Sequence, residues 1–479
     1  MLSPWNSVTS ELKQRFPQHV HTDVETLYSN SFDGLKISFL PQAVIRPDEV
    51  GMIAPVLRLA NQHRIPVTTR GVGSTLTGAA TPVNGGWVLD LHQLSQIEID
   101  PVHRIANVQC GAVVKDIQDS AAKVGLFYPP DPSSYKWCTI GGNIACNAGG
   151  LRCVKYGVTR DYVMGLKGFL ADGSEVEWGK PVRKFATGYN LRDLWIGSEG
   201  TLGIITSATL KLIPLPTHRR TALLGFRSEK AALDATLDLM TSTLTPSILE
   251  FIDTLSVRGA QESIGYPLFE DDSDICVLLV EIDGTDAHLL DAELNSLRRW
   301  MDQHSSLQSI AASEAEAEAL WTVRRQCSGA MFKLGNSKLN EDVVVPLSKM
   351  QDLIAHVSLL RETHHVPIAV FGHAGDGNLH VNIMYDREDK EMSLRAQNCL
   401  QSLMEKVVDL NGAISGEHGV GLAKSHFMEL QFNEAQLRLM REIKAVFDPN
   451  GILNPRKWFE PFSPWNYQKE SFRFPWDKH

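Results

Sequence analysis

The chain has 479 residues, more than a single hydrophobic core usually serves, so we expect two or three domains. Its 46 basic and 56 acidic side chains give a net charge of −10, which argues against nucleic acid as a partner and against a basic membrane-binding surface. The seven cysteines include no Cys-x-x-Cys pair, so they supply no iron–sulfur or zinc-ribbon framework and fit reduced thiols in a cytosol.

We expect no secretory signal in the first part of the chain. Residues Met1–Trp5 show no basic stretch followed by an apolar run, and no stretch approaches ~20 apolar residues, so we expect a cytoplasmic protein without a transmembrane helix. Residues 1–34 predict a helical lead-in. Beyond it, the sequence predicts strands over 43–45 and 65–69, separated by a helix over 47–60.

Three glycine-rich segments follow these strands, at 70–78, 139–157 and 197–205. The first does not open a helix, so it does not fit the dinucleotide fingerprint, and taken alone it is as compatible with a plain loop as with an anion-binding loop. In the second, Gly and Asn let the backbone pack against a large flat ligand, while Asn and Ser side chains serve its polar edge. Together the loops favour an extended cofactor lying across a scaffold of short strands.

The next region carries the pattern of a mixed α and β domain. Prolines within 210–216 indicate a domain boundary. Beyond it, 221–226 and 275–282 predict strands, and 228–240 and 287–301 predict amphipathic helices. Strand–helix–strand units with helices on one face of a sheet indicate an α+β fold.

Two short segments farther along concentrate the residues that could carry chemistry. In a straight strand His373 and His380 would lie ~23 Å apart on opposite faces, but the Gly375–Gly377 turn predicts a reversal that aims both imidazoles at one point. Neutral imidazole suits Zn²⁺, Glu417 is the natural third ligand, and the adjacent His418 is left to act as a base. Histidines flanked by glycine also occur in turns, bonded to backbone, so a purely structural role stays open.

The segments 373–380 and 416–421 together resemble the paired signatures of FAD-linked D-2-hydroxy acid dehydrogenases. This family, within the vanillyl-alcohol-oxidase-like flavoproteins, includes D-lactate dehydrogenases, the glycolate oxidase FAD subunit and D-2-hydroxyglutarate dehydrogenase. The resemblance covers roughly residues 35–457. It implies an α+β fold: a two-part FAD-binding domain of the vanillyl-alcohol-oxidase/PCMH type and an α+β cap, which is a ferredoxin-like antiparallel sheet with helices.

The resemblance also implies domain boundaries. We expect the lead-in over 1–34, the FAD-binding domain over 35–217, the substrate and metal cap with a C-terminal return to the flavin over 218–457, and an aromatic tail over 458–479. The tail is too aromatic to be solvated, so we expect it to pack over the protein or to contact a partner, either a second copy of the chain or another subunit. Peripheral contact with a membrane is the weaker alternative, because no basic amphipathic helix is present. The tail's aromatic residues are Trp458, Phe459, Phe462, Trp465, Tyr467, Phe472, Phe474 and Trp476.

The glycine loops would bind FAD if the resemblance holds. The first loop would wrap the pyrophosphate, the second would line the isoalloxazine and ribityl regions, and the third would hold the adenosine side. Some relatives attach FAD covalently through a histidine in the first loop, and Ser74 stands there in this chain, so we expect non-covalent FAD. The expected FAD-binding residues are Arg70, Gly71, Val72, Gly73, Ser74, Thr75, Gly78, Pro130, Ser133, Ser134, Thr139, Gly141, Gly142, Asn143, Asn147, Ala148, Gly149, Gly150, Gly157, Glu199, Gly203, Ile204 and Asn454.

The resemblance also points to substrate-binding residues. Arg324 could be an ordinary surface charge on a helix, but the resemblance favours a bidentate clamp on a substrate carboxylate, with Ser328 one turn later. Relatives that act on 2-hydroxyglutarate have a lysine where this chain has Asn340, and Lys338 lies two positions away. This departure favours a smaller acid, such as D-lactate or glycolate. Asn382 would point to the same side as the preceding histidine of its strand and would bond to the substrate.

These elements predict an FAD-dependent, metal-assisted oxidation of a small D-2-hydroxy acid to the 2-oxo acid. The metal would lower the pKa of the substrate hydroxyl, His418 would take its proton, and the C2 hydride would move to flavin N5. Electrons would leave to an external acceptor other than NAD: a quinone, a cytochrome, an electron-transfer flavoprotein or an iron–sulfur subunit. The alternatives left open are a D-2-hydroxyglutarate dehydrogenase, a metal hydrolase without flavin, a non-catalytic FAD subunit of a larger complex and an alkyl-transferring synthase.

Overall fold

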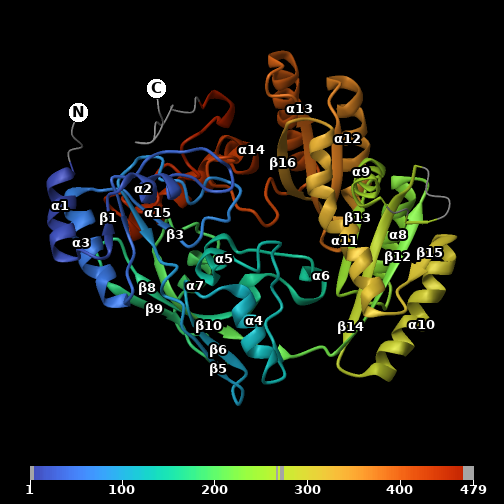
Figure 1. Ribbon diagram of the computed structural model, residues 1–479, viewed down its shortest axis with the longest axis horizontal. Coiled ribbons are helices and arrows are strands. Elements are labelled where there is room, and N and C mark those ends of the chain that lie inside the picture. The colour runs from blue at the N-terminus through green and yellow to red at the C-terminus, as the bar shows by residue number, and fades with distance from the viewer. Residues whose placement is uncertain (1–4, 266–267, 270–273, 468–479) are drawn as a thin grey trace. The chain divides into compact units, whose positions relative to one another are not determined.

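The computed structural model describes residues 5–265, 268–269 and 274–467 (Figure 1). The chain forms two compact units that are not consecutive in sequence. Unit 1 comprises Met1–Gly149, Val158–Pro214 and Glu417–His479, as far as these are described, and unit 2 comprises Gly150–Gly157 and Leu215–Gly416. Residues 150–157 and 417–457 therefore group differently from the domain boundaries that we expected. Among the described residues, no helix has the length and apolar character to cross a membrane.

Unit 1 contains two main sheets, in agreement with the two-part domain that the resemblance implies. The first has the strand order β1-β2-β4-β3, in which β2 and β3 both run parallel to β4. The residues Ala43–Ile45 of β2 are all buried, as expected for parallel strands covered on both faces. The elements of this part are α1 (Asn6–Arg15), β1 (Val20–His21), α2 (Val24–Ser29), β2 (Ala43–Ile45), η1 (Val50–Met52), α3 (Ile53–His63), β3 (Val67–Arg70) and β4 (Trp87–Asp90).

The second sheet of unit 1 is antiparallel, with the order β5-β6-β10-β8-β9. A register shift in β10 lies between Ile205 and Ser207, and such a bulge bends a strand locally. The elements are β5 (Ile97–Asp100), β6 (Ile105–Gln109), α4 (Val114–Ala122), β7 (Leu126–Phe127), α5 (Ile140–Cys146), η2 (Thr159–Tyr162), β8 (Val163–Phe169), β9 (Glu175–Gly179), α7 (Leu191–Trp195), β10 (Ile204–Lys211) and β11 (Ile213–Pro214).

The C-terminal segment completes unit 1. A parallel bridge pairs Leu453 with Val67 of β3, which fixes this segment beside the first glycine loop. Its elements are η6 (Ser425–Phe427), α14 (Met428–Gln431), α15 (Glu434–Phe447) and η7 (Pro464–Asn466). The tail packs on unit 1: the ring of Phe39 lies against those of Phe462 and Tyr467. The predicted tail residues Phe472, Phe474 and Trp476 lie outside the described residues.

Unit 2 is built on one sheet of seven strands in the order β15-β12-β14-β13-β17-β18-β16, with every neighbouring pair antiparallel. Its first four strands in chain order lie 4-1-3-2, the ferredoxin-like arrangement that we expected. The elements are α6 (Cys153–Tyr156), β12 (His218–Phe226), α8 (Glu229–Thr241), β13 (Ile248–Ile252), α9 (Thr254–Ile264), β14 (Cys276–Gly284), α10 (Ala287–His304), β15 (Leu307–Ile310), α11 (Glu314–Ala330), η3 (Met331–Lys333), β16 (Ser337–Val344), η4 (Leu347–Lys349), α12 (Met350–His364), β17 (Ile368–His373), η5 (Ala374–Asp376), β18 (Asn378–Tyr385) and α13 (Lys390–Asp409).

Both faces of this sheet are buried. Val277 and Leu279 belong to the apolar core that includes α9 and α11, whereas Leu278 and Val280, which point to the opposite face, are equally buried. The expectation of helices on a single face is therefore wrong. Helices α12 and α13 lie side by side in the same unit (Figure 1).

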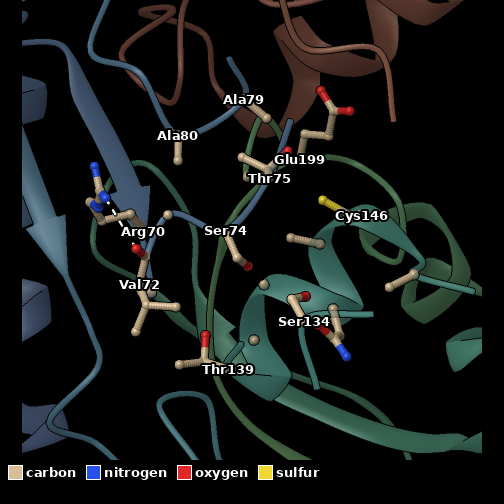
Figure 2. A pocket seen from close by; sticks show the side chains of 18 of the residues that line it. Arg70, Val72, Ser74, Thr75, Ala79, Ala80, Ser134, Thr139, Cys146 and Glu199 are labelled. Atoms are coloured by element: carbon tan, nitrogen blue, oxygen red, sulfur yellow. Dashed lines mark hydrogen bonds between the residues drawn. The ribbon is translucent and has the colours of Figure 1, made fainter. Parts of the chain in front are cut away.

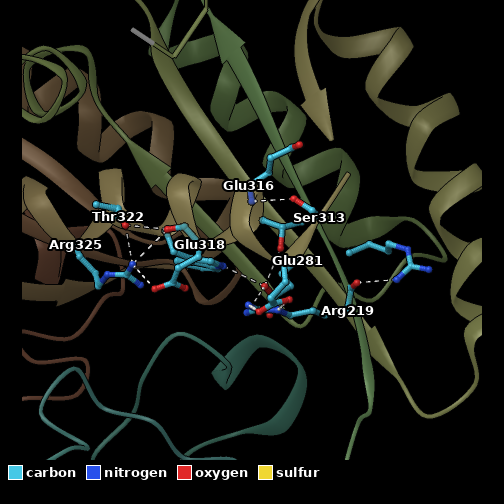
Figure 3. Close-up of polar contacts among 11 residues, drawn as sticks. Arg219, Glu281, Ser313, Glu316, Glu318, Thr322 and Arg325 are labelled. Atoms are coloured by element: carbon cyan, nitrogen blue, oxygen red, sulfur yellow. Dashed lines mark hydrogen bonds and ion pairs between the residues drawn. The ribbon is translucent and has the colours of Figure 1, made fainter. Parts of the chain in front are cut away.

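Helix α11 matters for the site because it carries Arg324. The Ser313 side chain caps its first turn by accepting a hydrogen bond from Glu316 N. The buried carboxylate of Glu281 on β14 accepts hydrogen bonds from Trp321 Nε1 at 3.1 Å and from Arg219 at 3.3 Å, which ties the helix to the sheet (Figure 3).

One helix boundary differs from the prediction. We expected a helix from residue 47, but α3 begins at Ile53, after the short 3₁₀ turn η1.

Candidate functional site

A cavity of about 270 Å³ lies within unit 1, at the ends of β3 and α5 (Figure 2). The glycine loops that the sequence singled out form most of its wall. The predicted residues that line it are Arg70, Gly71, Val72, Gly73, Ser74, Thr75, Ser133, Ser134, Thr139, Gly141, Gly142, Asn143, Ala148, Gly149, Glu199 and Gly203. Glu417 and His418 line it as well, which connects the second C-terminal signature to this cavity.

Several of the lining glycines are required by close backbone approach. A Cβ at Gly141 would lie 2.7 Å from Cys110 Cβ, and one at Gly203 would lie 2.2 Å from the Trp195 ring. A Cβ at Gly142, in the next position of the same helix, would have only Thr139 Oγ1 nearby, at 3.6 Å. The wall is therefore backbone packed tightly from behind, which leaves a smooth surface for a flat ligand.

Two polar atoms of the wall need a partner. Asn143 Nδ2 and Thr69 Oγ1 are buried and have no hydrogen-bond partner in the described part of the chain. Both residues line the cavity. Buried polar groups are nearly always hydrogen-bonded, so a ligand with polar atoms along its edge fits this wall.

The predicted reversal between the two histidines is present in unit 2. Strands β17 and β18 form a hairpin through η5, and Gly377 has the positive φ of +73° that the turn needs. The imidazole rings of His373 and His380 lie with centroids 5.2 Å apart and planes at 88°. Two side chains seven positions apart in sequence are thus brought together.

Glu250 on β13 holds one member of this histidine pair, His373. Its fully buried carboxylate is 2.5 Å from His373 Nδ1 and 2.5 Å from Arg324 Nε, and the Arg324 guanidinium lies over the Phe371 ring at 4.7 Å. Burial alone would raise the pKa of Glu250, but the charges of and hydrogen bonds from His373 and Arg324 hold it below the usual value. In the neutral form of His373, with Nδ1 donating to Glu250, Nε2 carries the lone pair that a metal ligand needs.

A second buried acid fixes the chain just before Glu417. Asp342 on β16 is fully buried, and its carboxylate accepts hydrogen bonds from Asn378 Nδ2 at 2.7 Å and from Gly416 N at 3.0 Å. Gly416 packs so closely here that a Cβ would lie 2.4 Å from Asn378 Nδ2. Glu417 is the next residue, so its Cα is within about 3.8 Å of this anchored glycine. Its place in a ligand set with the two histidines stays a prediction.

Family models match both parts of the chain: that for the FAD binding domain matches residues 41–179, and that for FAD linked oxidases, C-terminal domain, matches residues 215–458. Over 424 residues the chain is 38% identical to glycolate oxidase subunit GlcD of Bacillus subtilis (strain 168), covering 88% of this chain and 89% of that relative. It is 33% identical to D-lactate dehydrogenase of Anaerostipes hadrus, with 95% and 98% covered. This chain belongs to the FAD-linked oxidases.

The fold of this FAD-linked oxidase is similar to that of p-cresol methylhydroxylase with substrate bound, at a TM-score of 0.79 and 18% identity over 96% of this chain and 98% of that one. The predicted PCMH-type fold is confirmed. The chain is thus an FAD-linked oxidoreductase, and the cavity of unit 1 has the backbone wall and polar atoms that fit a flavin.

Some residues expected to bind FAD do not line the cavity of this FAD-linked oxidase. Asn147 ends α5 with a φ of +53°, and its Oδ1 accepts a hydrogen bond from Arg160 N. Asn454 Nδ2 donates to the carbonyls of Ala79 and Glu199, at 2.8 and 2.7 Å. The expected residues away from this cavity are Gly78, Pro130, Asn147, Ile204 and Asn454 in unit 1 and Gly150 and Gly157 in unit 2.

Arg70 lines the cavity but differs from the expectation in what its side chain does. The guanidinium donates to the carbonyls of Phe32 at 3.0 Å and of Asn30 and Val72 at 3.3 Å, so it stiffens the glycine loop from within (Figure 2). Burial lowers the pKa of Arg70. The side chain donates to backbone carbonyls, and the contact of this loop with the pyrophosphate stays a prediction.

The residues expected to bind the substrate also differ from one another in what their side chains contact. Asn382 is fully buried, and its Nδ2 donates to the carbonyls of Ala369 and His380, so the amide supports the hairpin. Its Oδ1 has no hydrogen-bond partner among the described residues, and its role toward a substrate stays a prediction. Ser328 on α11 accepts a hydrogen bond from Lys338 Nζ at 2.8 Å. Asn340 lies opposite Asn382 on the neighbouring strand, with its side chain on the same face of the sheet as that of Lys338.

Two residues of the site, Glu250 and Asp342, escaped the sequence analysis. Glu250 is the one polar residue in the apolar strand Ile248–Ile252, and a lone acid in such a run signals a buried, paired charge. Asp342 stands in the strand Ser337–Val344 beside another acid, Glu341, so its sequence carried no comparable signal.

Proposed function

We propose that this FAD-linked oxidase oxidises a small D-2-hydroxy acid, with D-lactate and glycolate as the favoured substrates, and passes the electrons to an external acceptor other than NAD. His373, His380 and Glu417 hold a divalent ion, with Zn²⁺ as the favoured metal. The observation that carries the proposal is the pair of buried acids that orient the donors: Glu250 sets the tautomer of His373, and Asp342 anchors the glycine before Glu417.

The donor set fits a divalent metal. Histidine ligands characteristically give their other ring N–H to a carboxylate, which fixes the ring and raises its basicity, and Glu250 supplies that carboxylate to His373. Two imidazoles and one carboxylate form a ligand set that leaves positions open for a substrate. When bound, the ion would act as a Lewis acid on the substrate's hydroxyl oxygen.

Two side chains handle the substrate in this proposal. Arg324 presents its two terminal nitrogens to the substrate carboxylate, while Glu250 holds Nε and keeps the guanidinium plane fixed. His418, two residues after the anchored Gly416 and in the wall of the flavin cavity, takes the proton of the hydroxyl at its imidazole. Bound FAD supplies the acceptor for the hydride that leaves C2.

FAD is held without a covalent bond in this proposal. Ser74 occupies the wall where some relatives have a linking histidine. Two thiols, Cys110 and Cys146, also line the cavity, and burial raises the pKa of each to about 12. A thiol is a nucleophile only as the thiolate, so neither is suited to attach the flavin. Denaturation with acid should release all the flavin into the supernatant.

The test is anaerobic reduction of the bound flavin by a panel of D- and L-2-hydroxy acids, with and without a chelator. His418→Ala should slow flavin reduction by D-lactate or glycolate by about 10²- to 10⁴-fold and leave the flavin content unchanged. His288→Ala, an exposed histidine at the start of α10, is the matched control and should behave as wild type. Undiminished reduction in His418→Ala would remove the base from the mechanism, and a wild-type flavin that no hydroxy acid reduces would instead favour a non-catalytic FAD subunit.

D-2-hydroxyglutarate is the second candidate substrate, because of Lys338. Its Nζ contacts Ser328 Oγ and lies 5.5 Å from the Phe332 ring, and no carboxylate pairs with it among the described residues. Burial lowers the pKa of Lys338. A half-buried ammonium without an acid suits the second carboxylate of a diacid, on the same sheet face as Asn340 and about 7 Å along the strand. Lys338→Met should raise KM for D-2-hydroxyglutarate at least tenfold and leave KM for D-lactate unchanged, and equal effects on both would remove this candidate.

A further inference from the structure

Glu199 occupies a backbone conformation that glycine would adopt more readily. Its φ is +51°, and it lies between Gly197 at +83° and Gly200 at +71°. A residue with a side chain is uncommon in this left-handed region. Glu199 is nonetheless buried in the cavity wall, with 4% of its surface exposed. The strain indicates that its side chain performs a task that glycine could not.

Both oxygens of the Glu199 carboxylate accept hydrogen bonds from donors in two other segments. Oε1 accepts a hydrogen bond from Val420 N at 2.6 Å, and Oε2 accepts from Gly421 N and from Trp458 Nε1, both at 2.8 Å. Each of these donors is an N–H that cannot accept in return. The donors therefore fit a carboxylate and not an amide, because an amide in its place would turn its own N–H₂ toward at least one donor.

The segment that follows His418 is held from both sides. On one side, Gly419 has no side chain, and a Cβ there would lie 2.0 Å from Glu199 Oε1. On the other side, the Thr77 carbonyl of the first glycine loop accepts from Leu422 N at 2.7 Å and from Ala423 N at 3.0 Å. The backbone of residues 419–423 is thus clamped between Glu199 and the glycine loop.

From this geometry we propose that Glu199 is a positioning residue for His418. Through the amides of Val420 and Gly421 it fixes the residue that takes the substrate's proton, and the Trp458 indole fixes Glu199 in turn. This assignment replaces the expected role of Glu199 in holding adenosine. It rests on the proposed function, because it names the device that aims the base of that reaction.

The proposal also explains why the chain returns to the cavity after α15. Asn454 Nδ2 donates to the Glu199 carbonyl at 2.7 Å, and Lys457 Nζ donates to the Thr81 carbonyl at 2.7 Å. Trp458 then supplies its indole to the carboxylate. Residues 454–458 therefore hold both the backbone and the side chain of Glu199. Trp458, the first residue of the aromatic tail, is the one that contacts the carboxylate.

The first test compares Glu199→Gln and Glu199→Asp with wild type by flavin content and by anaerobic flavin reduction with D-lactate or glycolate. Glu199→Gln should keep its FAD and its KM within about twofold, lose 10- to 100-fold in the rate at saturating substrate, and show a larger solvent deuterium isotope effect on that rate. Glu199→Asp should recover part of the rate. If Glu199→Gln loses FAD and activity in equal proportion, the proposal is overturned in favour of a role in cofactor binding. If Glu199→Gln reduces its flavin at the wild-type rate, Glu199 has no positioning role.

A second readout does not depend on turnover. Hydrogen exchange measured by mass spectrometry should show the amides of Val420 and Gly421 exchanging at least tenfold faster in Glu199→Gln. The amides of Leu422 and Ala423, bonded to Thr77, serve as the internal reference and should change less. Unchanged protection at 420–421 contradicts the clamp even if the proposed oxidation is correct.

The tail provides a milder variant in case Glu199→Gln does not fold. Trp458→Phe removes one donor and should lower the rate of flavin reduction three- to tenfold. Trp465→Phe, whose ring contacts His426 and not Glu199, is the matched control and should leave the rate unchanged. Equal behaviour of the two variants overturns the role of Trp458. If wild type itself is reduced by no 2-hydroxy acid, the proposed function has failed, and the exchange experiment still decides the clamp.

Discussion

The cavity of unit 1 is walled by backbone and small side chains, whereas the cluster of unit 2 consists of buried charged and polar side chains that hold one another. In the cavity, Gly141 and Gly203 are pressed against Cys110 and Trp195. In the cluster, Glu250 holds His373 and Arg324. The first region is defined by shape and the second by charge. They should therefore fail differently when altered, the first through steric overlap and the second through an unpaired charge.

The largest expected effect is the loss of the central acid. Glu250→Gln removes the charge that pairs Arg324 and His373 inside unit 2, and breaking a buried pair typically lowers the free energy of unfolding by about 3–5 kcal/mol. If His373 binds the proposed metal, loss of the carboxylate behind it should also weaken metal binding about 10- to 100-fold. Urea unfolding and metal analysis after dialysis measure the two effects.

The control for this variant lies on the same helix as Arg324. Glu318→Gln breaks the exposed pair with Arg325 (Figure 3) and should change the free energy of unfolding by less than about 1 kcal/mol. If Glu250→Gln were as mild as this control, the cluster would not depend on charge, and the contrast between the two regions would be lost.

An intermediate effect is expected from shape in the cavity wall. Gly141→Ala places a methyl group against Cys110 and should lower the free energy of unfolding of the apoprotein by about 1–3 kcal/mol. Gly142→Ala, one position along the same helix, has room behind it and should raise that free energy by up to about 1 kcal/mol, since alanine favours helix over glycine. Denaturant unfolding of both apoproteins measures the difference. Similar values would show that close packing does not define this wall.

The last prediction concerns one of the charges that unit 1 buries, and its effect depends on pH. Burial lowers the pKa of Lys457 to about 8, below its ordinary value near 10.5. Between these values the unfolded chain binds more protons at this group than the folded chain does. The contribution of Lys457 to the free energy of unfolding therefore rises with pH, by at most about 1.4 kcal/mol per pH unit. Lys457→Met should remove that gain, so its stability relative to wild type should fall from pH 8 to pH 10. Parallel stability profiles over this range would contradict the assignment.

Much of the fold could be predicted because its signals are local. The strand at Ala43–Ile45 appears as expected, and the alternation of strands and helices predicted the mixed α and β composition of unit 2. The reversal between His373 and His380 was predictable because only a glycine turn lies between them. Each of these features depends on residues a few positions apart, where periodicity and turn chemistry act directly.

The roles of single side chains could not be predicted in the same way. Arg70 follows a strand and precedes glycines, which fits an anion site, yet its guanidinium turns to the carbonyls of Asn30 and Phe32, forty positions earlier in sequence. Glu250 precedes its partner His373 by 123 positions. Glu199 lies in a glycine loop expected to contact adenosine, and only the folded chain brings Val420 and Trp458 to its carboxylate. Such pairings depend on long-range packing and leave no periodic trace.

The interleaved order of the two units has a consequence for synthesis of the protein. Unit 1 ends with Glu417–His479, and the bridge from Leu453 to Val67 and all three donors to the Glu199 carboxylate come from that segment. Once residues 1–416 have been translated, every residue of unit 2 is present, but the flavin cavity of unit 1 still lacks the residues that come from 417 onward. Unit 2 can therefore fold during translation, whereas stable loading of the cofactor must wait until the final segment has emerged.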